Sequence, residues 1–113
     1  MKMVIAVIRP EALEALKEAL LKADVAKMTV SQVRGCGQQM GYTETYRGNI
    51  VNVNLLSKVR VEIAVNDEFE QPTVDAIMNA ARTGKIGDGK IFVMPIEKCY
   101  RIRTGEEGPA AIG

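Results

Sequence analysis

The sequence predicts an α+β domain with the element order β-α-β-β-α-β. Three observations predict it: an apolar run at residues 3–8, apolar residues at helical spacing within 10–24 and 72–81, and strict alternation at 59–65. The length of 113 residues fits one domain, 1–113. An apolar content of 47% and a formal net charge of +1 favour a folded chain over a disordered one.

The first half of the chain contains a strand, a helix and a second strand. The continuous apolar run at 3–8 is typical of a strand covered on both faces. Pro10 begins a helix whose leucines recur at helical spacing and which ends near Asp24. The Thr- and Val-rich residues from about 28 to 34 predict the second strand, and Gly35 ends it.

The second half repeats this plan. Residues 59–65 alternate between apolar and polar, as in a half-buried strand. A second helix begins near Pro72, carries an apolar stripe of Val74, Ile77, Met78 and Ala81, and stops before Gly84. The apolar run 91–94 predicts the fourth strand, and 100–103 is a candidate for a short fifth.

Two segments fit neither period. Residues from about 37 to 57 form a long loop, and a loop of about 20 residues in a small domain is either functional or a missed element. The Gly-rich tail, residues 105–113, is expected to be flexible.

The predicted order is that of the ferredoxin-like fold, in which both helices cover one face of a four-stranded sheet. The other face also needs cover, because the first strand is apolar on both sides. No further element of the chain supplies this cover. We therefore expect a homo-oligomer whose sheets pack against one another.

The composition excludes several classes of chemistry. The chain has no His and only two cysteines, Cys36 and Cys99, so His-dependent nucleophiles and His-containing zinc sites cannot be built within one chain. With 15 basic and 14 acidic residues, it lacks the cationic excess of a general nucleic-acid binder. It has neither an apolar run of 18 residues nor a signal-peptide pattern, so we expect a cytoplasmic protein.

The Gly-rich loop at 82–90 is the most informative candidate site. Three glycines in six residues allow positive φ angles, so that successive amides can form an anion-binding nest between Lys85 and Lys90. A Walker A motif is rejected, because Ile91 replaces its Ser or Thr and the loop runs from helix to strand. A plain glycine turn with solvated lysines remains the alternative.

Basic residues elsewhere are weaker candidates. Arg101 and Arg103 project from one face of an extended segment, and forked guanidinium groups suit phosphate. Ordinary surface positions are the alternative for both, and also for Lys58. The glycines of 35–41 make a poor dinucleotide-binding fingerprint, but their backbone can approach a ligand closely.

Several motifs together resemble the PII family of nitrogen-regulatory signalling proteins. They are TGKIGDGKIFV at 83–93, RIRTGE at 101–106, MTV at 28–30, GxGxQxG at 35–41 and TExYRG at 43–48. The resemblance covers essentially the whole chain. It implies a compact homotrimer with nucleotide sites between subunits, for which ATP and ADP compete.

The resemblance also implies site residues, none of them catalytic. Those implied for the nucleotide are Thr29, Gly35, Gly37, Gln38, Gln39, Glu62, Gly87, Asp88, Gly89, Lys90, Arg101 and Arg103. With Mg-ATP bound, 2-oxoglutarate would be held by Gln39, Gly41, Lys58 and Gly87, and Gln39 would coordinate the magnesium ion. ADP lacks the γ-phosphate that helps to hold this metal, so the two nucleotides would favour different loop states.

In this resemblance, residues 37–57 are the T-loop, which docks onto partner proteins. The partner-binding residues are then Tyr46, Arg47, Gly48, Asn49, Ile50 and Val51. Val51 and Asn49 replace the Tyr and Ser that are modified in other members, so we expect control by metabolites alone. Arg47 points to an ammonium transporter, and glutamine synthetase or a nitrogenase-type enzyme are the other partners the family offers.

Two other classes of function share features with this sequence. A small ATP-hydrolysing or phosphoryl-transfer enzyme would use Glu62 or Asp88 to activate water. An RNA-binding module of the same topology would need paired aromatic residues on central strands, and the sequence does not provide such a pair.

Overall fold

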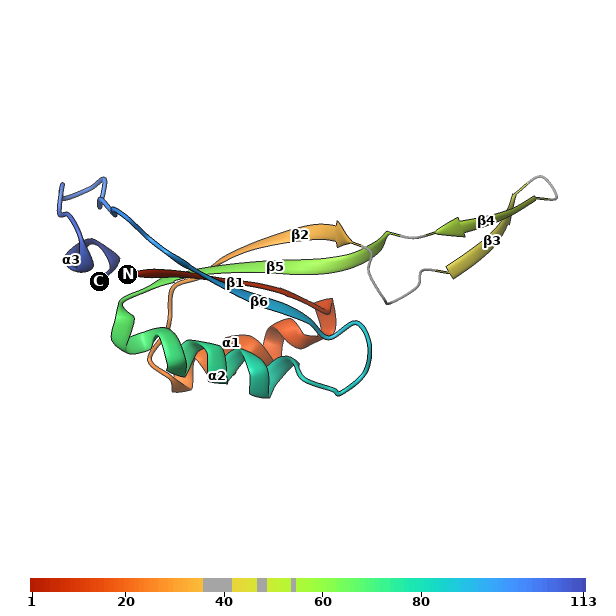
Figure 1. Ribbon diagram of the computed structural model, residues 1–113, viewed down its shortest axis with the longest axis horizontal. Helices are drawn as coiled ribbons and strands as arrows, with labels where there is room; N and C mark the ends of the chain where they lie inside the picture. Colours follow the sequence, from red (N-terminus) through yellow and green to blue (C-terminus); the bar gives the residue numbers. More distant parts are fainter. Residues whose placement is uncertain (36–41, 47–48, 54) are drawn as a thin grey trace.

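The computed structural model of the protein describes residues 1–35, 42–46, 49–53 and 55–113 (Figure 1). Its main sheet contains β1 (Lys2–Ile8), β2 (Thr29–Gly35), β5 (Leu56–Val65) and β6 (Gly89–Pro95). The strands are antiparallel and ordered β2-β5-β1-β6. Helices α1 (Leu13–Lys22) and α2 (Glu70–Ala81) follow the short 3₁₀ turns η1 (Pro10–Ala12) and η2 (Asp67–Phe69). The predicted ferredoxin-like fold is confirmed.

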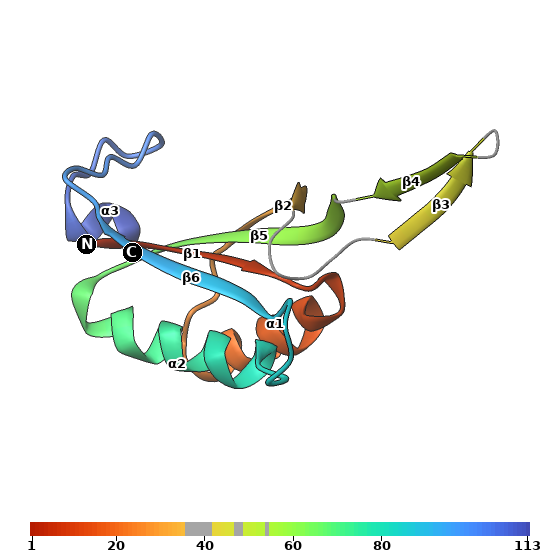
Figure 2. The ribbon, with the colours of Figure 1, turned by 45° about the vertical axis from the view of Figure 1, so that its right-hand side comes forward.

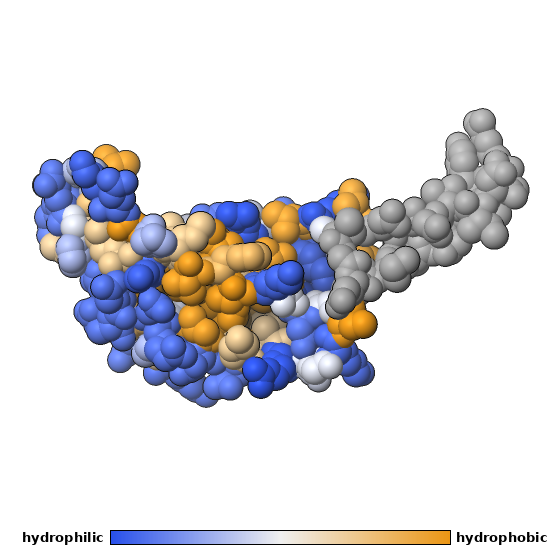
Figure 3. Space-filling view, in the orientation of Figure 1, coloured by the Kyte–Doolittle hydropathy of each residue, from blue (hydrophilic) through white to orange (hydrophobic). Residues whose placement is uncertain are grey.

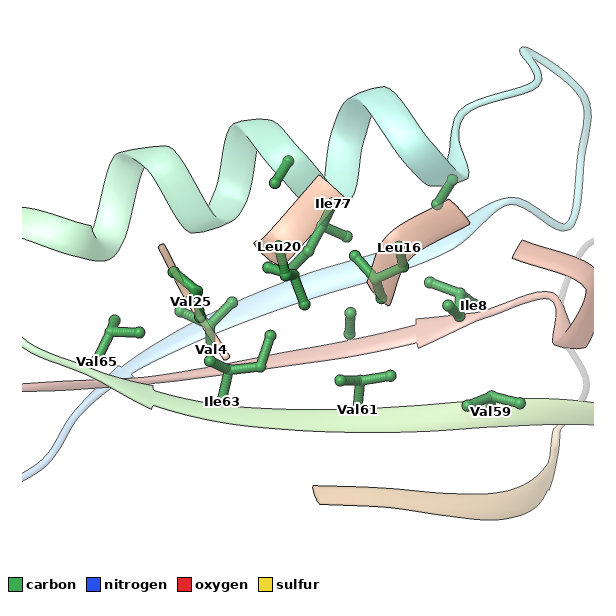
Figure 4. Packing of buried hydrophobic residues seen from close by; sticks show 13 residues of the cluster. Val4, Ile8, Leu16, Leu20, Val25, Val59, Val61, Ile63, Val65 and Ile77 are labelled. Carbon is green, nitrogen blue, oxygen red and sulfur yellow. The ribbon is translucent and has the colours of Figure 1, made fainter. Parts of the chain in front are cut away.

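Both helices lie on the same face of the sheet, and the core lies between the helices and the sheet (Figures 2 and 4). The register places Ala6 opposite Val61 on one side and Ile91 on the other, so these side chains share the helix face. Leu16, Leu20 and Ile77 of the helices are almost completely buried against this face. The core also contains Val4, Ile8, Val59, Ile63 and Val65.

Helix α1 ends where the sequence predicts a stop. Asp24 has a φ of 60°, and the next amide, that of Val25, donates to the Leu20 carbonyl at 2.9 Å. This is the left-handed termination that closes many helices. On α2 the predicted stripe is only partly correct, because Ile77 and Ala81 are buried while Met78 is 42% exposed.

The segment predicted as a loop over 37–57 contains two strands. β3 (Tyr42–Tyr46) and β4 (Asn49–Val53) pair as an antiparallel hairpin that extends away from the main sheet (Figure 1). A ribbon outside the sheet has no core face to impose an alternating pattern, so its residues carry no periodic signal. β5 also begins at Leu56, which is earlier than the predicted 59–65.

The chain beyond β6 also differs from expectation. The candidate fifth strand at 100–103 is not formed. Residues 102–104 form a turn, and an isolated bridge joins Tyr100 and Glu107. The tail expected to be flexible contains α3 (Pro109–Ile112). The Asn66 side-chain amide donates to the Pro109 carbonyl at 3.1 Å, and the Gly108 amide donates to the Cys99 carbonyl at 2.9 Å.

The sheet face opposite the helices, here called the open face, carries large apolar side chains. Phe92 and Met94 are 50% and 45% exposed, whereas Ile5 between the neighbouring strands is already buried. Apolar surface also gathers over β6 and the adjoining part of α2 (Figure 3). The sequence predicts an oligomer because this face of the sheet needs cover, and the exposed apolar side chains on it agree with that expectation.

Candidate functional site

The glycine loop between α2 and β6 has the positive φ angles that its glycines predict. Gly84, Gly87 and Gly89 have φ values of 87°, 106° and 103°, a region that side chains other than Gly rarely adopt. A Cβ atom on Gly89 would lie 1.7 Å from the Val7 carbonyl oxygen. Gly89 is therefore required both for its φ angle and for the close approach of the loop to β1.

Asp88 closes this loop upon itself. Its carboxylate accepts hydrogen bonds from the Thr83 hydroxyl, the Thr83 amide at 2.7 Å and the Gly84 amide at 2.8 Å. The Thr83 hydroxyl bond is the main reason that the pKa of Asp88 lies far below its ordinary value. The Asp88 carboxylate thus accepts hydrogen bonds from donors of the loop itself. The family resemblance, by contrast, implies that Asp88 contacts the nucleotide.

Arg9 is a residue of this region that sequence reasoning missed. Its Nη2 donates to the Ile86 carbonyl at 2.6 Å, and its Nε lies 3.4 Å from Asp88 Oδ1. In the sequence Arg9 is only the residue between a strand and a helix. The pairing of Ile8 with Gly89 is what brings Arg9 to the loop, and no local pattern reveals it.

Lys58 ties the loop to β5. It lies on β5, and its Nζ donates to the Gly87 carbonyl at 3.1 Å. A pocket of about 420 Å³ lies beside it, lined by Pro10, Gln32, Val33, Arg34, Ser57, Lys58 and Val59. The interpretation of Lys58 as an ordinary solvated lysine is therefore wrong, because it is half-buried and bound to the loop.

The register gathers several predicted site residues on the open face. Thr29 pairs directly with Glu62, and Gly35 pairs with Leu56 near the end of the sheet that carries the loop. Strand alternation places Thr29, Gly35, Lys58, Glu62 and Lys90 on this same face. The Glu62 carboxylate also forms an ion pair with Arg60, whose Nε lies 3.1 Å from Glu62 Oε1.

Arg101 and Arg103 lie at the opposite end of the sheet. β6 begins at the loop and runs past β1 until Pro95 lies opposite Lys2, so the residues that follow are far from the loop (Figure 1). Arg101 instead contacts Glu106 Oε1 at 3.0 Å and the Ala110 carbonyl at 3.2 Å. The expected projection of both arginines from an extended segment is wrong, because the segment turns here.

The remaining predicted residues are only partly described. Gly37, Gln38, Gln39, Gly41, Arg47 and Gly48 lie outside the described residues. Of the others on the hairpin, the backbone pairing places Tyr46 opposite Asn49, and Ile50 and Val51 on β4. In the ranges that are described, no group of three or more His, Cys, Asp or Glu side chains is placed to hold a metal ion. The same ranges contain no helix long and apolar enough to span a membrane.

Comparison with known proteins identifies the family of this chain. The family model described as "Nitrogen regulatory protein P-II" matches residues 1–106. The chain is 54% identical to nitrogen regulatory protein GlnK1 of Methanosarcina mazei over 114 residues, covering 99% of this chain and 97% of that protein. It is 53% identical to nitrogen regulatory protein P-II of Nostoc punctiforme over 112 residues, covering 99% and 100%. The chain therefore belongs to the P-II family of nitrogen regulatory proteins.

Proposed function

We propose that this P-II family member senses adenine nucleotides and passes their identity to a partner protein. The observation that carries the proposal is that Gly35, Lys58 and Lys90 share the open face at the end of the sheet that carries the loop of positive-φ glycines, with Thr29 and Glu62 further along the same face. In this proposal the amides of Gly87 and Gly89 and the ammonium of Lys90 bind the phosphates of ATP or ADP. Thr29 and Glu62 lie near the adenosine.

The working unit in this proposal is a homotrimer with three sites. The exposed Phe92 and Met94 support it, since an apolar sheet face of this kind is stabilised by burial against another subunit. Arg101 and Arg103 lie too far from the loop of their own chain to complete its site. They would instead reach the phosphates bound by the loop of a neighbouring subunit.

Magnesium and 2-oxoglutarate would bind at the base of the hairpin. Lys58 lines the pocket of about 420 Å³ and supplies a cation for a carboxylate. Gln39 would hold magnesium together with the γ-phosphate of ATP, and that ion would supply the positions for the keto acid. Because ADP lacks the γ-phosphate, only ATP would favour the keto-acid-bound state.

The hairpin of β3 and β4 would carry the signal to the partner. It extends away from the main sheet (Figure 1), and β5, the next strand along the chain, carries Lys58, which contacts the loop at Gly87. The partner would be an ammonium transporter, or glutamine synthetase or a nitrogenase-type enzyme. The protein would act in the cytoplasm and meet the membrane only through such a transporter.

Calorimetry with ATP and ADP, with and without magnesium and 2-oxoglutarate, tests this proposal. We expect both nucleotides to bind, and 2-oxoglutarate to bind only with Mg-ATP. Lys90→Ala should weaken nucleotide binding roughly tenfold or more, because a charge-assisted hydrogen bond is lost. Lys85→Ala removes a lysine from the same exposed loop and is the matched control. Absence of binding for both nucleotides at millimolar concentration would refute the proposal.

An ATP-hydrolysing enzyme is the alternative, and the loop geometry does not favour it. The carboxylate of Asp88 is engaged by Thr83, Gly84 and Arg9, so it is poorly placed to activate water. We expect no more than a trace of phosphate release in a steady-state assay. Substantial turnover that Glu62→Gln abolishes would favour the enzyme instead.

A further inference from the structure

Two side chains from outside the Gly-rich loop, those of Arg9 and Lys58, add to the bonds that Asp88 makes within it. Arg9 follows the last residue of β1 and donates to the Ile86 carbonyl at 2.6 Å. The same guanidinium reaches Asp88 Oδ1 at 3.4 Å. The side chains of Arg9 and Asp88 are only 17% and 22% exposed, so this pair is largely shielded from water. An ion pair in such surroundings is screened less than one on the surface.

The loop needs an external clamp because of its composition. Glycines lose more conformational freedom on folding than other residues, so a segment with Gly84, Gly87 and Gly89 is costly to hold in one shape. The bonds that hold it are made to side chains: two amides donate to Asp88, and two carbonyls accept from Arg9 and Lys58. Arg9 is the residue that contacts both the carbonyl and the carboxylate.

The bond to Ile86 also determines where the next amide points. In a planar trans peptide, the carbonyl of one residue and the N–H of the next point in opposite directions. Because Arg9 holds the Ile86 carbonyl, the Gly87 N–H is directed away from the guanidinium. Lys58 acts in the same way on the following peptide, so the Asp88 N–H is directed away from its ammonium group. Two successive amides are thus oriented by cations on their carbonyl sides.

Arg9 has a second, electrostatic effect. A carboxylate in a phosphate-binding loop repels the ligand, and Asp88 is ionised at neutral pH, since its pKa lies even below its ordinary value. The guanidinium beside it offsets this charge within the loop. Arg9 itself is engaged by Ile86 and Asp88, which distinguishes it from Lys90 on the open face.

We propose that Arg9 is a positioning residue for nucleotide phosphates, which acts by fixing the loop through Ile86 and Asp88 without touching the ligand. This inference rests on the proposed nucleotide-binding function. Its distinguishing consequence is that ATP and ADP should depend equally on Arg9, because the loop rather than the γ-phosphate is affected.

Nucleotide calorimetry on Arg9→Ala, with Lys22→Ala on the exposed face of α1 as the matched control, tests the inference. We expect Arg9→Ala to weaken the binding of ATP and of ADP by the same factor, roughly tenfold, and Lys22→Ala to change neither affinity. Arg9→Lys should recover part of the affinity, since it keeps one charged donor. The effect of Asp88→Asn should be smaller in the Arg9→Ala background than in the wild type, because the two residues form one unit.

Hydrogen exchange without nucleotide separates this inference from the proposed function. In Arg9→Ala, exchange should rise at the amides of Thr83 and Gly84, while the core amides of β5 keep their protection. Unchanged nucleotide affinity would overturn the inference, and so would a rise in exchange throughout β5 that Arg9→Lys does not reverse. If the wild type bound no nucleotide, the proposed function would fall. Equal loop exchange in wild type and Arg9→Ala would then show separately that Arg9 does not hold the loop.

Discussion

Gly89 marks the point at which the loop joins β6 and passes close to the neighbouring strand. A side chain there would meet the Val7 carbonyl oxygen at 1.7 Å, and its φ of 103° is strained for any other residue. We expect Gly89→Ala to lower the free energy of unfolding by about 3 kcal/mol. Gly84→Ala is the control, because its φ of 87° is similar and nothing lies within 4 Å of its Cβ position.

For Gly84→Ala only the backbone strain applies, and we expect a loss of about 1–2 kcal/mol. Urea unfolding of both variants measures the difference. Equal losses would show that the contact with Val7 relaxes at little cost.

Asp88 gives the loop a dependence on pH. Its pKa is lowered in the folded protein, first by the Thr83 hydroxyl, from an ordinary value of 3.8. The stabilisation is therefore complete above that value and is lost as the pH falls through it towards the folded pKa. We expect the difference in unfolding free energy between wild type and Asp88→Asn to be constant from about pH 7 to 5 and to shrink below about pH 4.

Urea unfolding across this range measures that difference. Asp67, whose pKa is also lowered, is present in both proteins and cancels in the comparison. A difference that is unchanged at pH 3 would contradict the assignment of the shift to Asp88.

At the level of elements, the segment after β6 is held by Glu106. Its carboxylate accepts from Arg101 Nη1 at 3.0 Å and from the Thr104 hydroxyl at 2.7 Å. The ion pair is exposed, so its removal should cost at most about 1 kcal/mol of global stability. We expect Glu106→Ala to accelerate hydrogen exchange at Gly105 and Gly108, whose amides bond to the Arg101 and Cys99 carbonyls.

Glu107→Ala is the matched control, since the neighbouring Glu107 is exposed and joins Tyr100 only through a backbone bridge. Similar exchange in the two variants would mean that the turn holds without its carboxylate.

At the scale of the whole molecule, we expect subunits to associate through the open face. Phe92 is 50% exposed there, and a charge at this position would be buried without a partner in a trimer. We expect the wild type to be trimeric and Phe92→Glu to be monomeric, as measured by light scattering coupled to gel filtration. Leu21→Glu is the control, because Leu21 is 62% exposed on α1, on the opposite side of the sheet. Dissociation by Leu21→Glu, or a stable trimer of Phe92→Glu, would contradict this interface.

Local patterns in the amino-acid sequence were enough to predict the order of the main-sheet elements along the chain and the glycine character of the loop. The apolar run at 3–8 and the alternation at 59–65 predict the burial of these strands. The glycines of the loop predict its positive φ angles. Such signals are local, because they depend on residues a few positions apart. The homotrimer, its ligands and its partners stay predictions that the experiments above address.

The contacts that hold the loop could be found only in the folded chain. Arg9 lies 77 residues from Ile86 and Lys58 lies 29 residues from Gly87, so no local period relates them. They meet because β6 pairs with β1 and places the loop beside the end of that strand. The hairpin of β3 and β4 was missed for a related reason: its strands pair only with each other, and without a core to face, their residues carry no alternating pattern.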